Sequence, residues 1–77
     1  MPRAAEPDQV LAAVLRRLRV EAALSQEHVA YNSGIATSSL AKIELGQSAP
    51  SWDSVRRIAT TLGVSLADLG AAVEAES

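Results

Sequence analysis

The side chains best suited to chemistry form a short polar run, Thr37-Ser38-Ser39, followed by Lys42. Hydroxyl groups both donate and accept hydrogen bonds, and a lysine ammonium donates three. No set of nucleophile, base and acid accompanies them, and no glycine-rich phosphate loop is present. The sequence has no cysteine, and its one histidine, His28, has no companion ligands and is expected at the surface or in a cap. We therefore expect no enzyme, metal or cofactor, and interpret the run as either a recognition surface or the solvated start of a helix.

Five amphipathic segments are available to position that run. Alanine-rich composition and the scarcity of β-branched runs favour helices, which we expect over about 9–22, 26–33, 37–45, 52–62 and 66–73. Side-chain caps are expected before four of these helices, at Asp8, Ser25, Ser51 and Ser65. Gly34 can adopt the positive φ of a tight turn between the second and third helices. The apolar face of the fourth helix is predicted to comprise Trp52, Val55, Ile58, Ala59 and Leu62.

The length of 77 residues allows one domain. We predict a flexible N-terminal arm over 1–7, a folded domain over 8–73 and a C-terminal tail over 74–77. No apolar run is long enough for a membrane span, and no secretion signal is recognisable, so a cytoplasmic location is expected. The formal net charge is −2, but 8–69 is neutral and the excess acid lies at Glu74 and Glu76. Net charge argues only mildly against a nucleic-acid partner.

Short motifs between Leu24 and Leu69 carry a family resemblance. They are, in order, Leu24-Ser25-Gln26-Glu27, Gly34-Ile35, Ile43-Glu44-x-Gly46, Pro50-Ser51 and Leu62-Gly63-Val64-Ser65. In this order and spacing they resemble the Cro/phage-repressor (XRE) family of helix-turn-helix domains, over about 10–69. The resemblance implies an all-α, compact five-helix bundle of the lambda-repressor-like type, whose second and third helices form the helix-turn-helix. It also implies a bacterial or phage-encoded regulator that binds double-stranded DNA with its third helix in the major groove.

The resemblance assigns roles to individual residues. The base-reading positions are Thr37, Ser38, Ser39 and Lys42. The phosphate-contacting positions are Ser25, Gln26, Gln47 and Ser48. A lysine can reach the O6 and N7 acceptors of guanine, and a helix N-terminus favours phosphate. Arg19 and Glu44 are expected to form a structural ion pair that ties the first helix to the third.

Several residues depart from the family pattern. Alanine occupies two positions, Ala36 and Ala23, where the family often has a capping hydroxyl and a glycine. Leu45 and the loop 47–49 lack basic residues, so each monomer is expected to make few phosphate contacts. A homodimer reading a short inverted repeat would compensate. Its interface is predicted at Leu66, Leu69, Ala72 and Val73, with Trp52 or Val64 near its edge, unless these residues only close the core.

A second class of function remains open from the sequence. The neutral charge of 8–69 and the lack of basic residues at Leu45 and in the loop 47–49 also fit a protein-interaction module. Such a module, antitoxin-like or partner-binding, would show weak or no DNA binding. Restriction-modification controller proteins and antitoxins of this fold are both of this size. Trp52 is interpreted as a packing residue, although an exposed patch or a nucleic-acid stacking role also fits a tryptophan at a helix start.

Overall fold

The computed structural model describes residues 7–77, which form five α-helices and contain no strand. The helices are α1 (Gln9–Glu21), α2 (Gln26–Ser33), α3 (Thr37–Glu44), α4 (Trp52–Leu62) and α5 (Leu66–Glu76). The all-α fold class is confirmed, and the predicted arm lies, apart from Pro7, outside the described residues. None of these five helices alone is long and apolar enough to cross a membrane; α4 and α5 reach that length only as a pair bent by 100°.

Four of the helices begin at a side-chain cap. The capping oxygens belong to Asp8, Ser25, Ser51 and Ser65, and each accepts the backbone N–H three residues later at 3.0 or 3.1 Å. Such a cap satisfies a donor that the first turn leaves unpaired and is worth about 1 kcal/mol. The exception is α3, whose N-cap, Ala36, has extended backbone and no side-chain acceptor. In the first turn of α3 the N–H of Ser39 donates to the Ala36 carbonyl at 3.0 Å, and those of Thr37 and Ser38 are left for another partner.

Two left-handed residues set the turns on either side of α2. Gly34 ends α2 with φ +72°, a conformation that glycine adopts without steric cost. Ala23, between α1 and α2, has φ +58° and is the only non-glycine residue with positive φ in 7–77. The Cβ of an L-residue makes that conformation less favourable by roughly 1–2 kcal/mol. The chain thus places alanine where its own backbone favours glycine.

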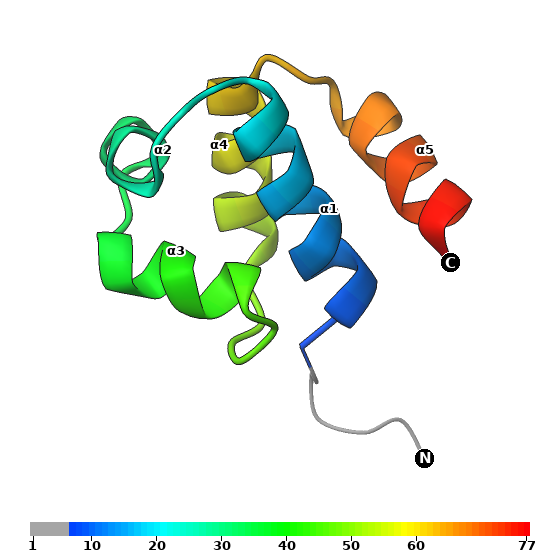
Figure 1. The fold of residues 1–77 in the computed structure, drawn as a ribbon, viewed down its shortest axis with the longest axis horizontal. Coiled ribbons are helices and arrows are strands. Elements are labelled where there is room, and N and C mark those ends of the chain that lie inside the picture. Colours follow the sequence, from blue (N-terminus) through cyan, green and yellow to red (C-terminus); the bar gives the residue numbers. More distant parts are fainter. Residues whose placement is uncertain (1–6) are drawn as a thin grey trace.

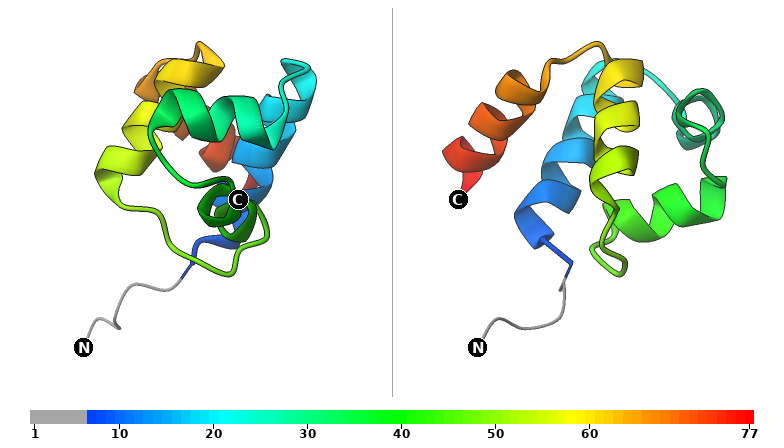
Figure 2. Two further views of the ribbon diagram at one scale, coloured as in Figure 1. Left: turned by 90° about the vertical axis from the view of Figure 1, so that its left-hand side faces the viewer. Right: turned by 180° about the vertical axis from the view of Figure 1, so that it is seen from behind.

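The core holds the second and third helices against the rest of the molecule. In Figures 1 and 2, α1 and α4 lie in the middle, with α2 and α3 on one side and α5 on the other. Both α2 and α3 pack on this centre, α2 against α4 and α3 against α1. The largest fully buried side chains are Leu15, Leu40, Ile58, Val14 and Val29. Burying each contributes about 1.5–3 kcal/mol, so α3 is presented on a rigid support.

The end of α5 and the exposure of Trp52 on α4 differ from the prediction. α5 continues to Glu76, so most of the segment 74–77 is helical rather than a tail. Leu69 is only 4% exposed and belongs to the core of the monomer. Trp52 does not join the buried face of α4, because it lies at the first residue of the helix and is 68% exposed.

Candidate nucleic-acid interface

One face of α3 is polar and open to solvent. Its exposed residues are the four predicted base-reading positions, Thr37, Ser38, Ser39 and Lys42. Leu40 and Ile43, on the opposite face, are buried in the core. Because α3 lies at the outer edge of the molecule, its polar face is accessible to a large ligand (Figure 1). Hydroxyls on such a face can donate to and accept from base edges, and the one ammonium can donate to them.

Arg19 and Glu44 form a bidentate ion pair between α1 and the last residue of α3. The Nε and Nη2 atoms of Arg19 donate to the two carboxylate oxygens of Glu44 at 2.8 and 3.0 Å. The side chains are only 13% and 2% exposed. The hydrogen bond to Glu44 raises the pKa of the Arg19 guanidinium above its ordinary value, against the opposing effect of burial. The Arg19 guanidinium therefore stays charged in neutral solution.

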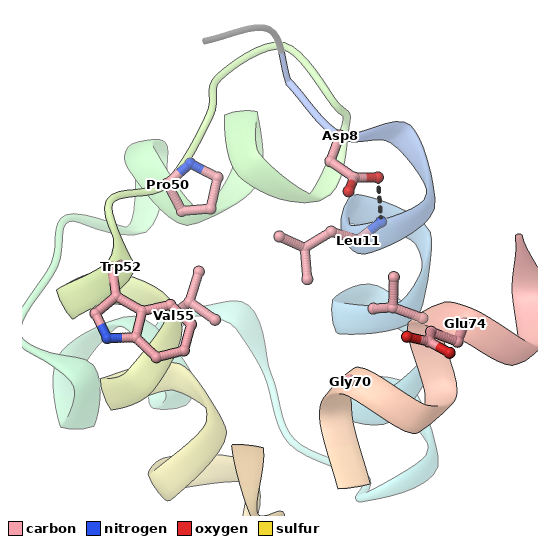
Figure 3. Close-up of a pocket in the computed structure, with 8 residues that line it drawn as sticks. Asp8, Leu11, Pro50, Trp52, Val55, Gly70 and Glu74 are labelled. Atoms are coloured by element: carbon pink, nitrogen blue, oxygen red, sulfur yellow. Dashed lines mark hydrogen bonds between the residues drawn. The ribbon is translucent and has the colours of Figure 1, made fainter. Parts of the chain in front are cut away.

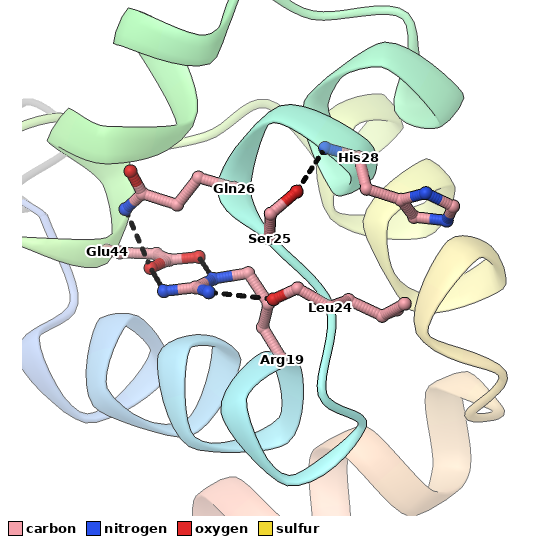
Figure 4. Close-up of polar contacts among 6 residues, drawn as sticks. All are labelled: Arg19, Leu24, Ser25, Gln26, His28 and Glu44. Carbon is pink, nitrogen blue, oxygen red and sulfur yellow. Dashed lines mark hydrogen bonds and ion pairs between the residues drawn. The ribbon is translucent and has the colours of Figure 1, made fainter.

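Two further hydrogen bonds extend this ion pair to the start of α2 (Figure 4). Arg19 Nη1 donates to the carbonyl of Leu24 at 2.9 Å, in the turn before α2. Gln26 Nε2 donates to the Oε1 atom of Glu44 at 3.1 Å. One buried carboxylate thus joins three helices: α1 through Arg19, α2 through Gln26 and α3 through its own backbone.

The predicted phosphate-contacting residues lie in two places. Ser25 and Gln26 are at the N-terminus of α2, the first exposed and the second half-buried against Glu44. Gln47 and Ser48 follow α3, the first exposed and the second half-buried. Backbone N–H groups at a helix N-terminus and side-chain donors are the groups that bind phosphate oxygens.

The loop after α3 is held by a residue that the sequence analysis did not select. Gln9, the first residue of α1, donates from Nε2 to the carbonyl of Gly46 at 2.8 Å. A Cβ at Gly46 would overlap the amide of Gln9, so this close approach requires glycine. Gln9 therefore fixes the backbone immediately before Gln47. Nothing in the local sequence pattern marks it, because the two partners are distant in the chain.

Most of the basic side chains in 7–77 are already paired with acids. Arg56 and Arg57 both contact Asp53, at 2.8 and 2.9 Å, and Arg17 contacts Glu21 and Glu76 at 3.7 and 3.3 Å. In this part of the chain Lys42 has no such partner. The positive charge on the polar face of α3 is therefore that of one lysine. No three histidine or acidic side chains among the described residues lie close enough to hold a metal ion.

A shallow groove of about 470 Å³ lies on the other side of the molecule, between α1, α4 and α5 (Figure 3). Its lining residues are Asp8, Leu11, Pro50, Trp52, Val55, Gly70, Val73 and Glu74. The indole of Trp52 stands on one wall, on α4, and Leu11 and Gly70 lie across from it. Of the predicted interface residues on α5, only Val73 lines this groove. Leu66 and Ala72 are half-buried against the core.

Comparison with known proteins identifies the fold. A family model described as "Helix-turn-helix domain" matches residues 10–72. The restriction-modification controller protein C.AhdI from Aeromonas hydrophila is 33% identical, with a TM-score of 0.76 over 79% of this chain and 92% of that chain. The clp gene regulator ClgR from Corynebacterium glutamicum is 25% identical, with a TM-score of 0.84 over 92% and 78%. The controller protein C.Esp1396I, 24% identical, has a TM-score of 0.84 over 88% and 87% and supports the fold. No curated protein matches the sequence.

These matches confirm the resemblance carried by the short motifs. The family model spans nearly the whole described chain, including α2, the turn at Gly34 and α3. The chain belongs to the helix-turn-helix domain family, of the Cro/phage-repressor (XRE) type, and is a DNA-binding transcriptional regulator.

Proposed function

We propose that this regulator binds a short inverted repeat in double-stranded DNA as a two-fold homodimer, with α3 of each copy in the major groove. The observation that carries the proposal is the exposed face of α3, whose polar residues surround Lys42 while its other face is buried. Helix-turn-helix domains present the start and outward face of this helix to base edges. The setting is expected to be the cytoplasm of a bacterium, with the gene bacterial or phage-encoded.

Base reading falls to the four exposed residues of α3. Lys42 donates to the O6 and N7 atoms of a guanine, and the hydroxyls of Thr37, Ser38 and Ser39 exchange hydrogen bonds with neighbouring base edges. The uncapped start of α3 at Ala36 supports this assignment, since its first N–H groups are left without a side-chain acceptor. The three hydroxyl side chains are short, so α3 must approach the base edges closely for them to make these hydrogen bonds.

Phosphate contacts come from the start of α2 and from the loop after α3. The hydroxyl of Ser25 accepts the His28 N–H at 3.0 Å and keeps its own hydrogen to donate to a phosphate oxygen. Gln26 and the N-terminus of α2 add donors beside it. Gln47 and Ser48, which follow α3 in the chain, contact phosphates of the DNA backbone beyond the other end of that helix. All four side chains are neutral, so the affinity of one copy is expected to depend weakly on salt.

A second copy of the chain is the proposed occupant of the groove beside Trp52. Leu69 serves the core of its own monomer, and of the residues predicted for the interface or its edge only Trp52 and Val73 line the groove. Trp52 is an exposed aromatic side chain next to an open groove. In a two-fold pair, each indole enters the groove of the other copy, and the same patch serves both.

Sedimentation equilibrium tests the dimer. The wild-type protein is expected at twice the 8.0 kDa mass of the chain, and Trp52→Ala is expected to shift it toward monomer. Tyr31→Ala is the matched control, because Tyr31 is another aromatic residue, 86% exposed, that does not line the groove. A wild-type monomer at all concentrations would contradict the homodimer, and a dimeric Trp52→Ala variant would contradict this interface.

A gel-shift assay tests DNA recognition. Duplexes selected from a random pool are titrated with the dimer at low salt, against an unselected duplex of equal length. The proposal predicts tighter binding of the selected duplexes. Equal binding of both by an intact dimer would contradict it and would favour the alternative of a protein-interaction module. That alternative draws on Leu45, which is 66% exposed, and on the loop 47–49 without basic residues.

Among the possible biological roles of this regulator, we propose that of a restriction-modification controller. The support is the likeness to C.AhdI, which is described as such a controller and is 33% identical to this chain. Genes for a methyltransferase and an endonuclease beside this one are the expected result of inspecting its genomic surroundings. A toxin gene or a phage cluster there would instead indicate an antitoxin or a phage-type regulator.

A further inference from the structure

Glu44 accepts hydrogen bonds from two side chains at once. Arg19 occupies both carboxylate oxygens, at 2.8 and 3.0 Å, and Gln26 donates to the Oε1 atom at 3.1 Å. The carboxylate is 2% exposed, so water does not compete for it. A structural ion pair needs only the first partner. The contact with Gln26 therefore calls for a separate explanation.

We propose that Glu44 is a positioning residue for DNA binding, which fixes the side-chain amide of Gln26 for its phosphate contact. The inference rests on the proposed function, in which Gln26 meets the DNA backbone. A carboxylate can only accept hydrogen bonds, so Gln26 must turn its amide nitrogen, not its oxygen, toward Glu44. One N–H of the amide is held by Glu44, and the second remains to donate to a phosphate oxygen.

This arrangement lowers the entropic cost of binding. A free glutamine side chain samples many rotamers and loses that freedom when it contacts a ligand. Gln26 is already ordered in the unbound protein by its bond to Glu44. Ordering a donor before the ligand arrives increases affinity without adding a contact.

Arg19 makes the arrangement compatible with a phosphate nearby. An unpaired carboxylate beside the DNA backbone would repel it. The bidentate guanidinium of Arg19 balances the charge of Glu44. Glu44 therefore orients Gln26 through its oxygen atoms without presenting a net negative charge.

The arrangement also ties the phosphate contact to the reading helix. Glu44 is the last residue of α3, two positions after Lys42, and Gln26 is the first residue of α2. The hydrogen bond between them sets the start of α2 relative to α3. A phosphate held at Gln26 thus fixes the position of Lys42 along the major groove.

A double-mutant cycle tests the coupling. Affinities for one selected duplex are measured for wild type, Gln26→Ala, Glu44→Gln and the double variant. The second change keeps the shape of the side chain but removes its charge. Losing a hydrogen bond to a charged phosphate in each copy predicts about tenfold weaker binding per copy, and about a hundredfold for the dimer, in Gln26→Ala. Glu44→Gln is expected to weaken binding of the Gln26 protein but to have little further effect in Gln26→Ala. Independent effects that multiply in the double variant would overturn the proposal.

A measurement on the unmodified protein keeps the test independent of folding. In ¹⁵N-resolved NMR spectra of free wild type, the side-chain NH₂ protons of Gln26 are expected to exchange with water more slowly than those of Gln47. Gln47 is the matched control because it is exposed and has no partner for its amide among the described residues. Equal exchange at the two glutamines would overturn the proposal.

The proposed function and the positioning role of Glu44 can fail separately. A wild-type dimer that shows no preference among duplexes contradicts the proposed function itself. Specific binding that is unchanged in Gln26→Ala leaves sequence-specific DNA binding standing, and overturns the phosphate contact of Gln26 together with the role of Glu44.

Discussion

Arg19 and Glu44 join the first helix to the end of the reading helix through two parallel hydrogen bonds of 2.8 and 3.0 Å. Both side chains are largely withdrawn from water, so each depends on the other for charge compensation. The pair leaves the opposite, exposed face of α3 free for base edges. It is thus a structural element placed directly behind the proposed reading surface.

Removing one partner of this pair is expected to destabilise the fold strongly. Glu44→Ala leaves the Arg19 guanidinium without its partner, and we expect a loss of about 3–5 kcal/mol in the free energy of unfolding. Urea denaturation followed by circular dichroism measures it. The control is Glu21→Ala, which removes an exposed ion pair with Arg17 and should change stability by about 1 kcal/mol or less. Similar losses in the two variants would contradict this account.

Ala23 offers a stabilising substitution. Its φ of +58° suits glycine better than alanine, so Ala23→Gly is expected to raise the free energy of unfolding by about 1 kcal/mol. Thermal unfolding measures the change. Ala22→Gly is the neighbouring control: Ala22 has φ −79°, and glycine there should bring no gain. An equal effect at both positions would show that the left-handed backbone is not the cause.

The uncapped start of α3 predicts a second substitution that increases the stability of the fold. Ala36 has the extended backbone of an N-cap (φ −70°, ψ 145°), so the hydroxyl of Ala36→Ser can accept an N–H in the first turn. We expect about 1 kcal/mol of added stability, and a similar loss for Ser51→Ala, which removes an existing cap. Stability unchanged in Ala36→Ser would mean that these N–H groups do not need a capping acceptor.

Lys42 and Gln26 are expected to affect DNA binding in different ways. Lys42→Ala should relax the preference at one base pair by about 1–3 kcal/mol, because a base-edge contact is lost. Gln26→Ala should weaken binding to all sequences about equally, because a phosphate contact carries no base preference. Affinities for a set of single-base variants of a selected duplex separate the two patterns. The assignment is wrong if Gln26→Ala changes the preference and Lys42→Ala does not.

The elements that depend on local hydrogen bonds were predictable from the sequence. Asp8, Ser25, Ser51 and Ser65 cap helices because each side chain reaches an N–H only three residues away. Gly34 marks its turn for a similarly local reason. The approximate bounds of the first four helices follow from these signals.

The contacts that join distant residues were harder to predict. The bonds from Gln26 to Glu44 and from Gln9 to Gly46 span 18 and 37 positions, and no local pattern marks them. The apolar pattern of the fifth helix ends at Val73, and acidic residues near a helix C-terminus are unfavourable. Arg17 of α1 reaches Glu76 at 3.3 Å and offsets that effect from outside the helix. The exposure of Trp52 likewise depends on how α1, α4 and α5 pack.

The sequences that the dimer selects from a random pool of duplexes test the central claim most directly. If α3 of two copies reads two half-sites, the selected duplexes contain an inverted repeat with half-sites about 10 base pairs apart, or a multiple of that spacing. The same selection with Lys42→Ala should lose information at one position in each half-site. A selected set without two-fold symmetry, or no enrichment at all, would contradict the account.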